Sequence, residues 1–269
     1  MSTFLSSGEI GRILGVSVAT VRRWADAGLL PSQRTAGGHR RFSLAVAEQL
    51  AQQRGGIDRG LDGWVRLLVT PGGALAVDAA LLGERSRGGS WLAVAETIGG
   101  VLDELGARWH GGALSVIDEH VASARLARAL ARAADALPAR PGGPRVLLAT
   151  AEGEAHTLGL ALVELCVRER GWSAAWIGRD TSTEHLAARV AAGETDVLAV
   201  SASVCRAPHE LAAAAEGLAA ACAARGVELV VGGRGPWPDQ LPHGALVRTF
   251  AGLSAWMDAI ERRVRERGR

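Results

Sequence analysis

Beyond Pro144 the chain alternates short apolar runs with longer amphipathic stretches, and this alternation constrains the fold more than any other feature. Amphipathic helices are predicted to begin near His156, Thr183, Pro208 and Ser254. Strands that alternate with helices form a parallel, doubly wound sheet, so we expect an α/β domain of about five strands. The apolar runs are residues 145–150 (RVLLAT), 173–178 (SAAWIG), 197–201 (VLAVS), 228–233 (ELVVGG) and 245–250 (ALVRTF).

Two stretches rich in glycine and proline divide the 269-residue chain into three segments. They are Arg54–Gly60 (RGGIDRG) and Leu137–Pro144 (LPARPGGP). The middle segment is rich in helix formers, and a hydrophobic content of 48% indicates globular domains throughout. The sequence therefore predicts a multidomain α and α/β protein with domains at residues 1–56, 60–137 and 144–269.

Neither a membrane span nor a secretory signal is expected. No apolar run has the length that a bilayer requires, and the first twelve residues lack the basic start and long apolar core of a signal peptide. The three cysteines, Cys166, Cys205 and Cys222, are scattered and show no metal-ligand spacing. This pattern favours reduced thiols in the cytoplasm over a disulfide framework.

Charge is unevenly distributed along the chain. The net charge is only +2, but residues 1–59 contain eight arginines against four acidic residues. A basic first segment on a nearly neutral chain suggests a polyanionic partner, although a merely solvated basic face has the same composition.

The first segment is predicted to form two short helices around a tight turn at Gly15. Ser7 is expected to cap the first helix and Ser17 the second. The inner face of the second helix is assigned to Val18, Val21 and Trp24. Arg22 and Arg23 then point outward, which is the arrangement of a helix-turn-helix that enters the major groove.

After Pro31 the sequence RTAGGHRRF predicts a glycine-centred hairpin, or wing, with arginines that lie along phosphates. Residues 3–55, above all VRRWADAGLLPSQRTAGGHRRF, resemble the DNA-binding domain of the MerR family of transcription regulators. The resemblance implies a winged helix-turn-helix on double-stranded DNA. Arg22 and Arg23 would face the groove, while His39, Arg40 and Arg41 would touch phosphates. A helical hairpin with incidental arginines is the alternative.

In the last segment, Glu154 and His156 follow the first predicted strand, at the edge where parallel sheets bind ligands. Glu154 is close enough to accept a proton from one imidazole nitrogen, which leaves the other free to bind a metal. Gly159 lacks a side chain and would let a bulky group pass the start of the next helix. Taken alone, the pattern also fits an ordinary loop histidine.

Two later motifs follow at the ends of the third and fourth predicted strands. Ser201 and Ser203 form the first, and the pair Gly232 and Gly233 forms the second. Together with Glu-x-His-x-x-Gly, the set resembles the flavodoxin-like, Rossmann-type cobalamin-binding domain of corrinoid methyl carriers, cobalamin mutases and certain regulators. The resemblance implies that His156 is the lower cobalt ligand, that Glu154 orients it, and that the nucleotide tail contacts Gly159, Ser201, Gly232 and Gly233. Ser203 stands where the pattern usually has leucine, so which serine meets the tail stays open.

In the middle segment, Trp109 and His110 end one predicted helix, while Glu119 and His120 lie in the first turns of the next. One interpretation is that Trp109 is a core residue and that Glu119 and His120 form an exposed pair. The spacing from Trp109 to Glu119 also resembles the four-helix bundle of the CarH/LitR photoreceptor regulators, which share this order of three domains. That resemblance implies that Trp109, Glu119 and His120 surround the adenosyl group of adenosylcobalamin, the cofactor.

The whole-chain resemblance implies a light-responsive transcriptional repressor and not an enzyme. In the dark it would form a homo-oligomer, a tetramer in this family, and bind operator DNA. Light would break the cobalt–carbon bond and release the DNA. His110 would then either become an upper cobalt ligand or only hydrogen-bond at the helix end while water binds the cobalt. Two alternatives are a corrinoid methyl carrier and a regulator that senses cobalamin level without responding to light.

Overall fold

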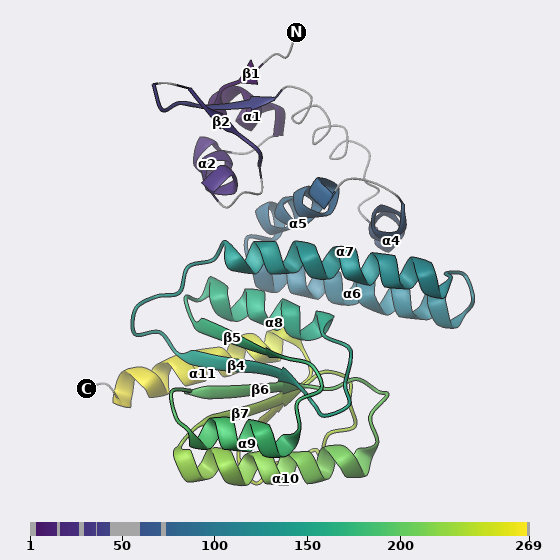
Figure 1. Ribbon diagram of the computed structural model, residues 1–269, viewed down its shortest axis with the longest axis vertical. Helices are drawn as coiled ribbons and strands as arrows, with labels where there is room; N and C mark the ends of the chain where they lie inside the picture. The colour runs from purple at the N-terminus through teal and green to yellow at the C-terminus, as the bar shows by residue number, and fades with distance from the viewer. Residues whose placement is uncertain are drawn as a thin grey trace. The chain divides into compact units, whose positions relative to one another are not determined.

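The computed structural model describes residues 4–14, 17–26, 30–35, 37–43, 60–70 and 74–267 (Figure 1). The chain divides into two compact units, Met1–Ala136 and Leu137–Arg269. The predicted turn at Gly15 and residues 44–59 lie outside the described residues. Within the described part of the chain, no helix has both the length and the apolar character that a membrane span needs.

The N-terminal part of the first unit, which we call the head, is a small helix-turn-helix with a three-stranded antiparallel sheet of order β1-β3-β2. Its buried residues include Ile10, Val21, Trp24, Leu30 and Phe42. The elements are β1 (Phe4–Leu5), α1 (Ser7–Leu14), α2 (Val18–Asp26), β2 (Gln33–Arg34) and β3 (Arg40–Ser43). The strands β2 and β3 form the predicted wing, with Arg34 opposite Arg40 and Gln33 opposite Arg41.

Two details of the head differ from the prediction. Ser6, not Ser7, caps α1: its hydroxyl accepts from the Glu9 amide at 3.3 Å, and its own amide donates to the Glu9 carboxylate at 2.7 Å. Val18 is 40% exposed and does not belong to the inner face. Because a helix turns once every 3.6 residues, Val18 shares the outer face with Arg22, four positions later. The predicted cap of α2 is confirmed, since the Ser17 hydroxyl accepts from the Thr20 amide at 3.1 Å.

The described residues between Gly60 and Ala136 are mainly helical, which confirms the predicted helical middle segment. Trp64, Trp91, Ile98, Leu126 and Leu130 are among its buried side chains. The helices, which pack against one another, are α4 (Leu61–Val69), α5 (Ala74–Gly88), α6 (Trp91–His110) and α7 (Val116–Asp135).

The second unit is a five-stranded parallel sheet of order β5-β4-β6-β7-β8, which confirms the predicted α/β fold. The strands are β4 (Arg145–Thr150), β5 (Ser173–Gly178), β6 (Val197–Ser201), β7 (Glu228–Gly232) and β8 (Ala245–Val247). The helices are α8 (Leu158–Glu169), α9 (Thr183–Ala191), α10 (Pro208–Arg225) and α11 (Phe250–Arg267). Helices α9 and α10 cover one face of the sheet and α8 and α11 the other (Figure 1).

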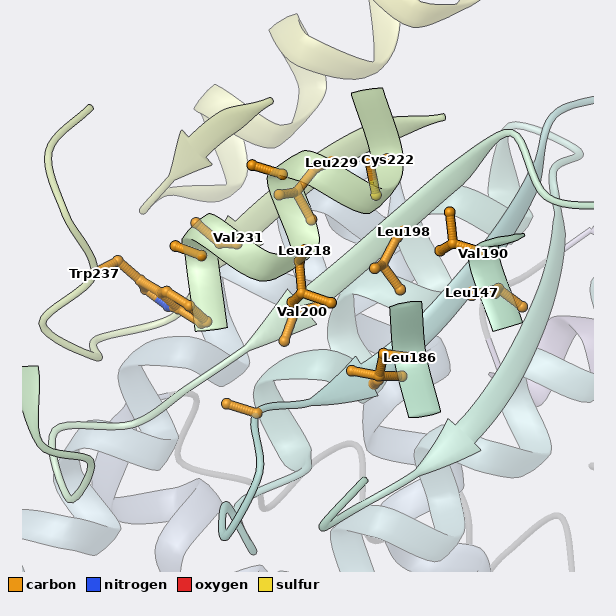
Figure 2. Packing of buried hydrophobic residues seen from close by; sticks show 14 of the residues in the cluster. Leu147, Leu186, Val190, Leu198, Val200, Leu218, Cys222, Leu229, Val231 and Trp237 are labelled. Atoms are coloured by element: carbon orange, nitrogen blue, oxygen red, sulfur yellow. The ribbon is translucent and has the colours of Figure 1, made fainter. Parts of the chain in front are cut away.

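A buried core lies between the sheet and α9 and α10. Leu147, Leu198, Val200, Leu229 and Val231 come from the central strands, and they pack against Leu186, Val190, Leu218 and Cys222 of the two helices (Figure 2). Burial on both faces explains why the central strands are nearly continuous apolar runs rather than alternating ones.

The last strand is shorter and the last helix begins earlier than the sequence predicts. Strand β8 ends at Val247, and α11 begins at Phe250 instead of Ser254. The reason is a cap: the Thr249 hydroxyl accepts from the Gly252 amide at 3.0 Å and starts the helix there.

Candidate functional site

Strand register places the last residues of three strands side by side at the carboxyl edge of the sheet. Thr150 of β4 pairs with Ser201 of β6, and Ser201 pairs with Gly232 of β7. The loop that carries Glu154 and His156 leaves the sheet at this same edge. The edge to which parallel α/β sheets bind ligands therefore holds all the motifs that the sequence singled out in this unit.

Glu154 holds His156 in the loop before α8. The side chain of Glu154 is 1% exposed, and its Oε1 atom lies 2.6 Å from Nδ1 of His156. The same oxygen accepts from the backbone amide of His156 at 2.8 Å, which keeps this residue in the loop and delays the helix until Leu158. The His156 ring is 68% exposed, and its Nε2 atom forms no hydrogen bond within the described residues.

Ser203 completes the surroundings of Glu154. Its backbone amide donates to Oε2 of Glu154 at 2.6 Å, and its hydroxyl accepts from the Cys205 amide at 3.3 Å. Burial raises the pKa of Glu154, but the hydrogen bonds from Ser203 and His156 outweigh it and lower the pKa overall. An ionised Glu154 accepts a hydrogen bond from the protonated Nδ1 of His156, which leaves the Nε2 lone pair available to a metal.

The glycines at this edge have two different roles. A side chain at Gly232 would come within 2.7 Å of the Val247 carbonyl oxygen, and one at Gly233 within 2.3 Å of the Ala202 carbonyl oxygen. Packing of the chain itself therefore requires both glycines. A Cβ atom at Gly159 would meet nothing within 4 Å, so packing leaves this position open for a bulky group near His156. The donor set and the open position at Gly159 fit a corrinoid whose cobalt binds an imidazole.

Trp109 lies on the surface of the helical part of the first unit. It is 48% exposed near the end of α6, so it is not the core residue that one interpretation of the sequence assumed. His110 is exposed, and Gly112 in the following turn has φ +74°, a conformation suited to glycine. Three further exposed apolar side chains, which sequence reasoning missed, follow on α7: Val116, Ile117 and Val121.

Glu119 and His120 form a polar pair at the start of α7. His120 Nε2 lies 3.7 Å from the Glu119 carboxylate, and the His120 ring is 73% exposed. The hydroxyl of Ser123, one turn later, donates to Oε1 of Glu119 at 2.5 Å. Glu119 is thus held in place on the helix while His120 stays accessible.

The predicted DNA-contacting side chains lie on the head. Arg22, Arg23 and His39 are exposed, and Arg41 is half-buried on β3. A depression of about 510 Å³ is lined by the start of α1, by α2 and by the wing. It is lined by Ser6, Ser7, Gly8, Val18, Arg22, Arg34, Gly38, His39, Arg40 and Arg41.

Arg40 differs from the other arginines of the head because its guanidinium is already engaged. Its side chain is 14% exposed, donates to the Arg22 carbonyl oxygen at 2.9 Å and forms an ion pair with Asp26. The hydrogen bond to Asp26 raises the pKa of Arg40, and the same bond lowers the pKa of Asp26. This geometry favours a role for Arg40 in joining the wing to α2 over the predicted phosphate contact.

Two known protein families match separate parts of the chain. Residues 6–42 match the MerR family regulatory protein family, and residues 144–243 match the B12 binding domain family. A curated relative, the HTH-type transcriptional repressor CarA of Myxococcus xanthus, is 38% identical over 135 residues. The match covers 50% of this chain and 44% of the relative, so the chain spans less than half of that protein.

One solved structure supports the fold. The monomethylamine corrinoid protein of Methanosarcina barkeri superposes with a TM-score of 0.56 at 16% identity, covering 76% of this chain and 97% of that one. A cobalamin-binding protein from Desulfitobacterium hafniense matches 74% of this chain and 98% of its own at 15% identity, with a TM-score of 0.38. The chain therefore matches the MerR family in its helix-turn-helix and the B12 binding domain family in the unit built on a five-stranded parallel sheet.

Proposed function

We propose that this protein is a transcriptional repressor that binds adenosylcobalamin and releases its operator DNA in the light. The observation that carries the proposal is His156, whose Nε2 atom is free while Nδ1 lies against Glu154, in a chain that also has a MerR-type head. A single chain thus has a candidate cobalt ligand and a DNA-binding surface. No substrate turnover is implied, and the protein would act in the cytoplasm.

In this proposal the second unit holds the cofactor. His156 is the lower cobalt ligand, Glu154 orients it, and Gly159, Ser201, Gly232 and Gly233 contact the nucleotide tail. Ser203 acts through Glu154, to which its backbone amide donates. When bound, adenosylcobalamin supplies a cobalt–carbon bond that visible light breaks.

We assign recognition of the adenosyl group to Trp109, Glu119 and His120. An exposed indole can stack on adenine, and the polar pair can hydrogen-bond the base edge and the ribose. His110 is proposed as an upper cobalt ligand after illumination, because a neutral imidazole binds such a metal well. The glycines that follow it permit a local shift of the backbone.

The head is proposed to bind double-stranded DNA through Arg22 and Arg23 in the major groove and His39 and Arg41 on phosphates. One small head makes few contacts, so tight binding requires several heads on one operator. A homotetramer that forms in the dark supplies them.

Size-exclusion chromatography and DNA binding of the full chain with adenosylcobalamin, in darkness and after green light, test the proposal. We expect a larger assembly and tight DNA binding in the dark, both lost on illumination, and His156→Ala should abolish the response. DNA binding that depends on adenosylcobalamin but ignores light would instead indicate a cobalamin-level sensor. Cobalamin binding without any effect on DNA binding would favour a methyl carrier.

A further inference from the structure

The peptide group of Gly153, directly before Glu154, is held from two sides by different loops. Its amide donates to Oδ1 of Asp180 at 2.9 Å, and its carbonyl oxygen accepts from Nη1 of Arg206 at 3.3 Å. Asp180 follows β5 and Arg206 follows β6, the two neighbours of β4 in the sheet. Gly153 itself has φ +70°.

The backbone of Asp180 adopts an energetically unfavourable conformation at this position. Its φ of 58° lies in the left-handed region, which a residue other than glycine rarely adopts and which persists where surrounding contacts enforce it. Its amide donates to the Thr150 hydroxyl at 3.3 Å, and that hydroxyl donates to the Glu154 carbonyl oxygen at 2.8 Å. Asp180 is thus connected to the Glu154 loop through both its side chain and its backbone.

Arg206 closes the other side of the loop. Its Nη2 atom is paired with Glu210 at 2.5 Å, which directs the guanidinium toward Gly153. The approach is so close that a Cβ atom at Gly153 would lie 2.6 Å from Nη1. The Nε atom is buried and has no hydrogen-bond partner among the described residues. Keeping a polar atom buried and unpaired is costly, which indicates that the position of this guanidinium matters.

We propose that Asp180 and Arg206 are positioning residues for the lower cobalt ligand: they hold the Gly153 peptide from opposite sides and so keep Glu154 and His156 ready for the corrinoid. The inference rests on the proposed role of His156. A loop fixed before binding loses little conformational freedom when the cofactor arrives, and partners of this kind, one step removed from the metal, affect metal affinity strongly.

Four variants separate positioning from general stability. Asp180→Gly removes the acceptor for the Gly153 amide and also relieves the positive φ. Asp180→Asn keeps an acceptor oxygen and tolerates the same φ, so it should behave like the wild type. Arg206→Met removes the donors but keeps an apolar stem. Arg189→Met is a matched control, because Arg189 also donates to a glycine carbonyl, that of Gly193 at 2.8 Å, outside the candidate site.

The test uses the full chain, with amide hydrogen exchange of residues 151–156 in the cofactor-free protein as the first measurement. The second is the electron paramagnetic resonance spectrum of the protein with bound cob(II)alamin, in which ¹⁵N-histidine labelling identifies a histidine nitrogen on cobalt. Asp180→Gly and Arg206→Met should accelerate exchange, reduce the histidine-ligated fraction and raise the Kd for cobalamin about 10- to 100-fold. Asp180→Asn and Arg189→Met should match the wild type.

If Asp180→Gly and Arg206→Met retain full histidine ligation and the wild-type Kd, the positioning role is wrong while the proposed function stands. If the wild type itself shows no histidine nitrogen on cobalt, the proposed role of His156 is wrong and the inference falls with it. A loss of ligation in Arg189→Met equal to that in Arg206→Met would also overturn the inference, because the effect would then be a general loss of stability.

Discussion

Glu154 and Ser203, 49 residues apart in the chain, are joined by a hydrogen bond of 2.6 Å from the Ser203 amide to Oε2 of Glu154. The other oxygen of Glu154 lies 2.6 Å from Nδ1 of His156. A buried carboxylate therefore links the loop after β4 to the loop after β6, and its charge sets which nitrogen of His156 carries the proton.

We expect Glu154→Gln to weaken cobalamin binding about 10-fold or more, because the amide group cannot accept from both Ser203 and His156.

The lowered pKa of Glu154 means that its ionised form stabilises the fold above the ordinary glutamate pKa, and that this stability is lost as the pH falls through the lower, folded-state pKa. Urea unfolding of the cofactor-free protein from neutral pH to about pH 3 should show the wild type and Glu154→Gln converging. Glu152→Gln, which changes an exposed neighbour, should leave both properties nearly unchanged.

Trp109→Ala should alter cofactor selectivity with little effect on stability. Trp109 is 48% exposed, so we expect a loss of less than about 1 kcal/mol in the free energy of unfolding, whereas Trp91→Ala, at 4% exposure, should cost about 3–5 kcal/mol. Chromatography in the dark should show that adenosylcobalamin and methylcobalamin no longer differ in driving assembly of Trp109→Ala. Retained discrimination by a folded Trp109→Ala protein would assign the role to another residue.

Arg23→Ala should weaken DNA binding and lower the slope of log affinity against log salt concentration by about one, as expected for a single phosphate or groove contact.

Asp26→Ala distinguishes the two roles of Arg40. Removing an acid near DNA strengthens binding if only net charge matters, but weakens it if Asp26 and Arg40 together position the wing. We expect weaker binding, measured by fluorescence anisotropy at several salt concentrations. Tighter DNA binding by Asp26→Ala would instead support the predicted contact between Arg40 and a DNA phosphate.

The three cysteines should differ sharply in reactivity. Cys205 is exposed, whereas Cys166 and Cys222 are buried. Burial, reinforced by the charge of Glu228, raises the pKa of Cys222 to about 11, so its reactive thiolate is scarce near neutral pH. Iodoacetamide followed by mass spectrometry should modify Cys205 alone in the native protein and all three in urea. Labelling of native Cys222 at the rate of Cys205 would contradict the packing of α10 on the sheet.

Arg132→Met should destabilise the helical part of the first unit by about 2 kcal/mol, because it leaves the buried Asp78 carboxylate without its partner at 2.7 Å. Burial already raises the pKa of Asp78, although Arg132 opposes the shift. Because its pKa is raised, Asp78 is protonated at a higher pH in the folded protein than in the unfolded chain. The free-energy cost of burying its charge therefore disappears as the pH falls. The gap in unfolding free energy between Arg132→Met and wild type should therefore shrink in acid, and Asp78→Asn combined with Arg132→Met should restore part of the lost stability.

The sequence by itself determined the elements and their chemistry. Apolar runs separated by amphipathic helices predict a parallel sheet wherever the strands must be buried on both faces, and all five predicted strands are present. His156 was placed correctly beside Glu154 because the two are only two residues apart. Arg22 and Arg23 were predicted as exposed because helical periodicity alone sets their side of α2.

Only the tertiary structure decided the partners that lie far apart in the chain. Ser203 reaches Glu154, and Asp180 and Arg206 reach Gly153, because the strand order brings the loops after β4, β5 and β6 to one edge. In the head, the contacts of Arg40 with Asp26 and with the Arg22 carbonyl oxygen likewise join residues that are distant in the chain. Local sequence specifies backbone conformation and the polarity of each face, whereas contacts across strands depend on register and crossover, which follow from packing of the whole domain.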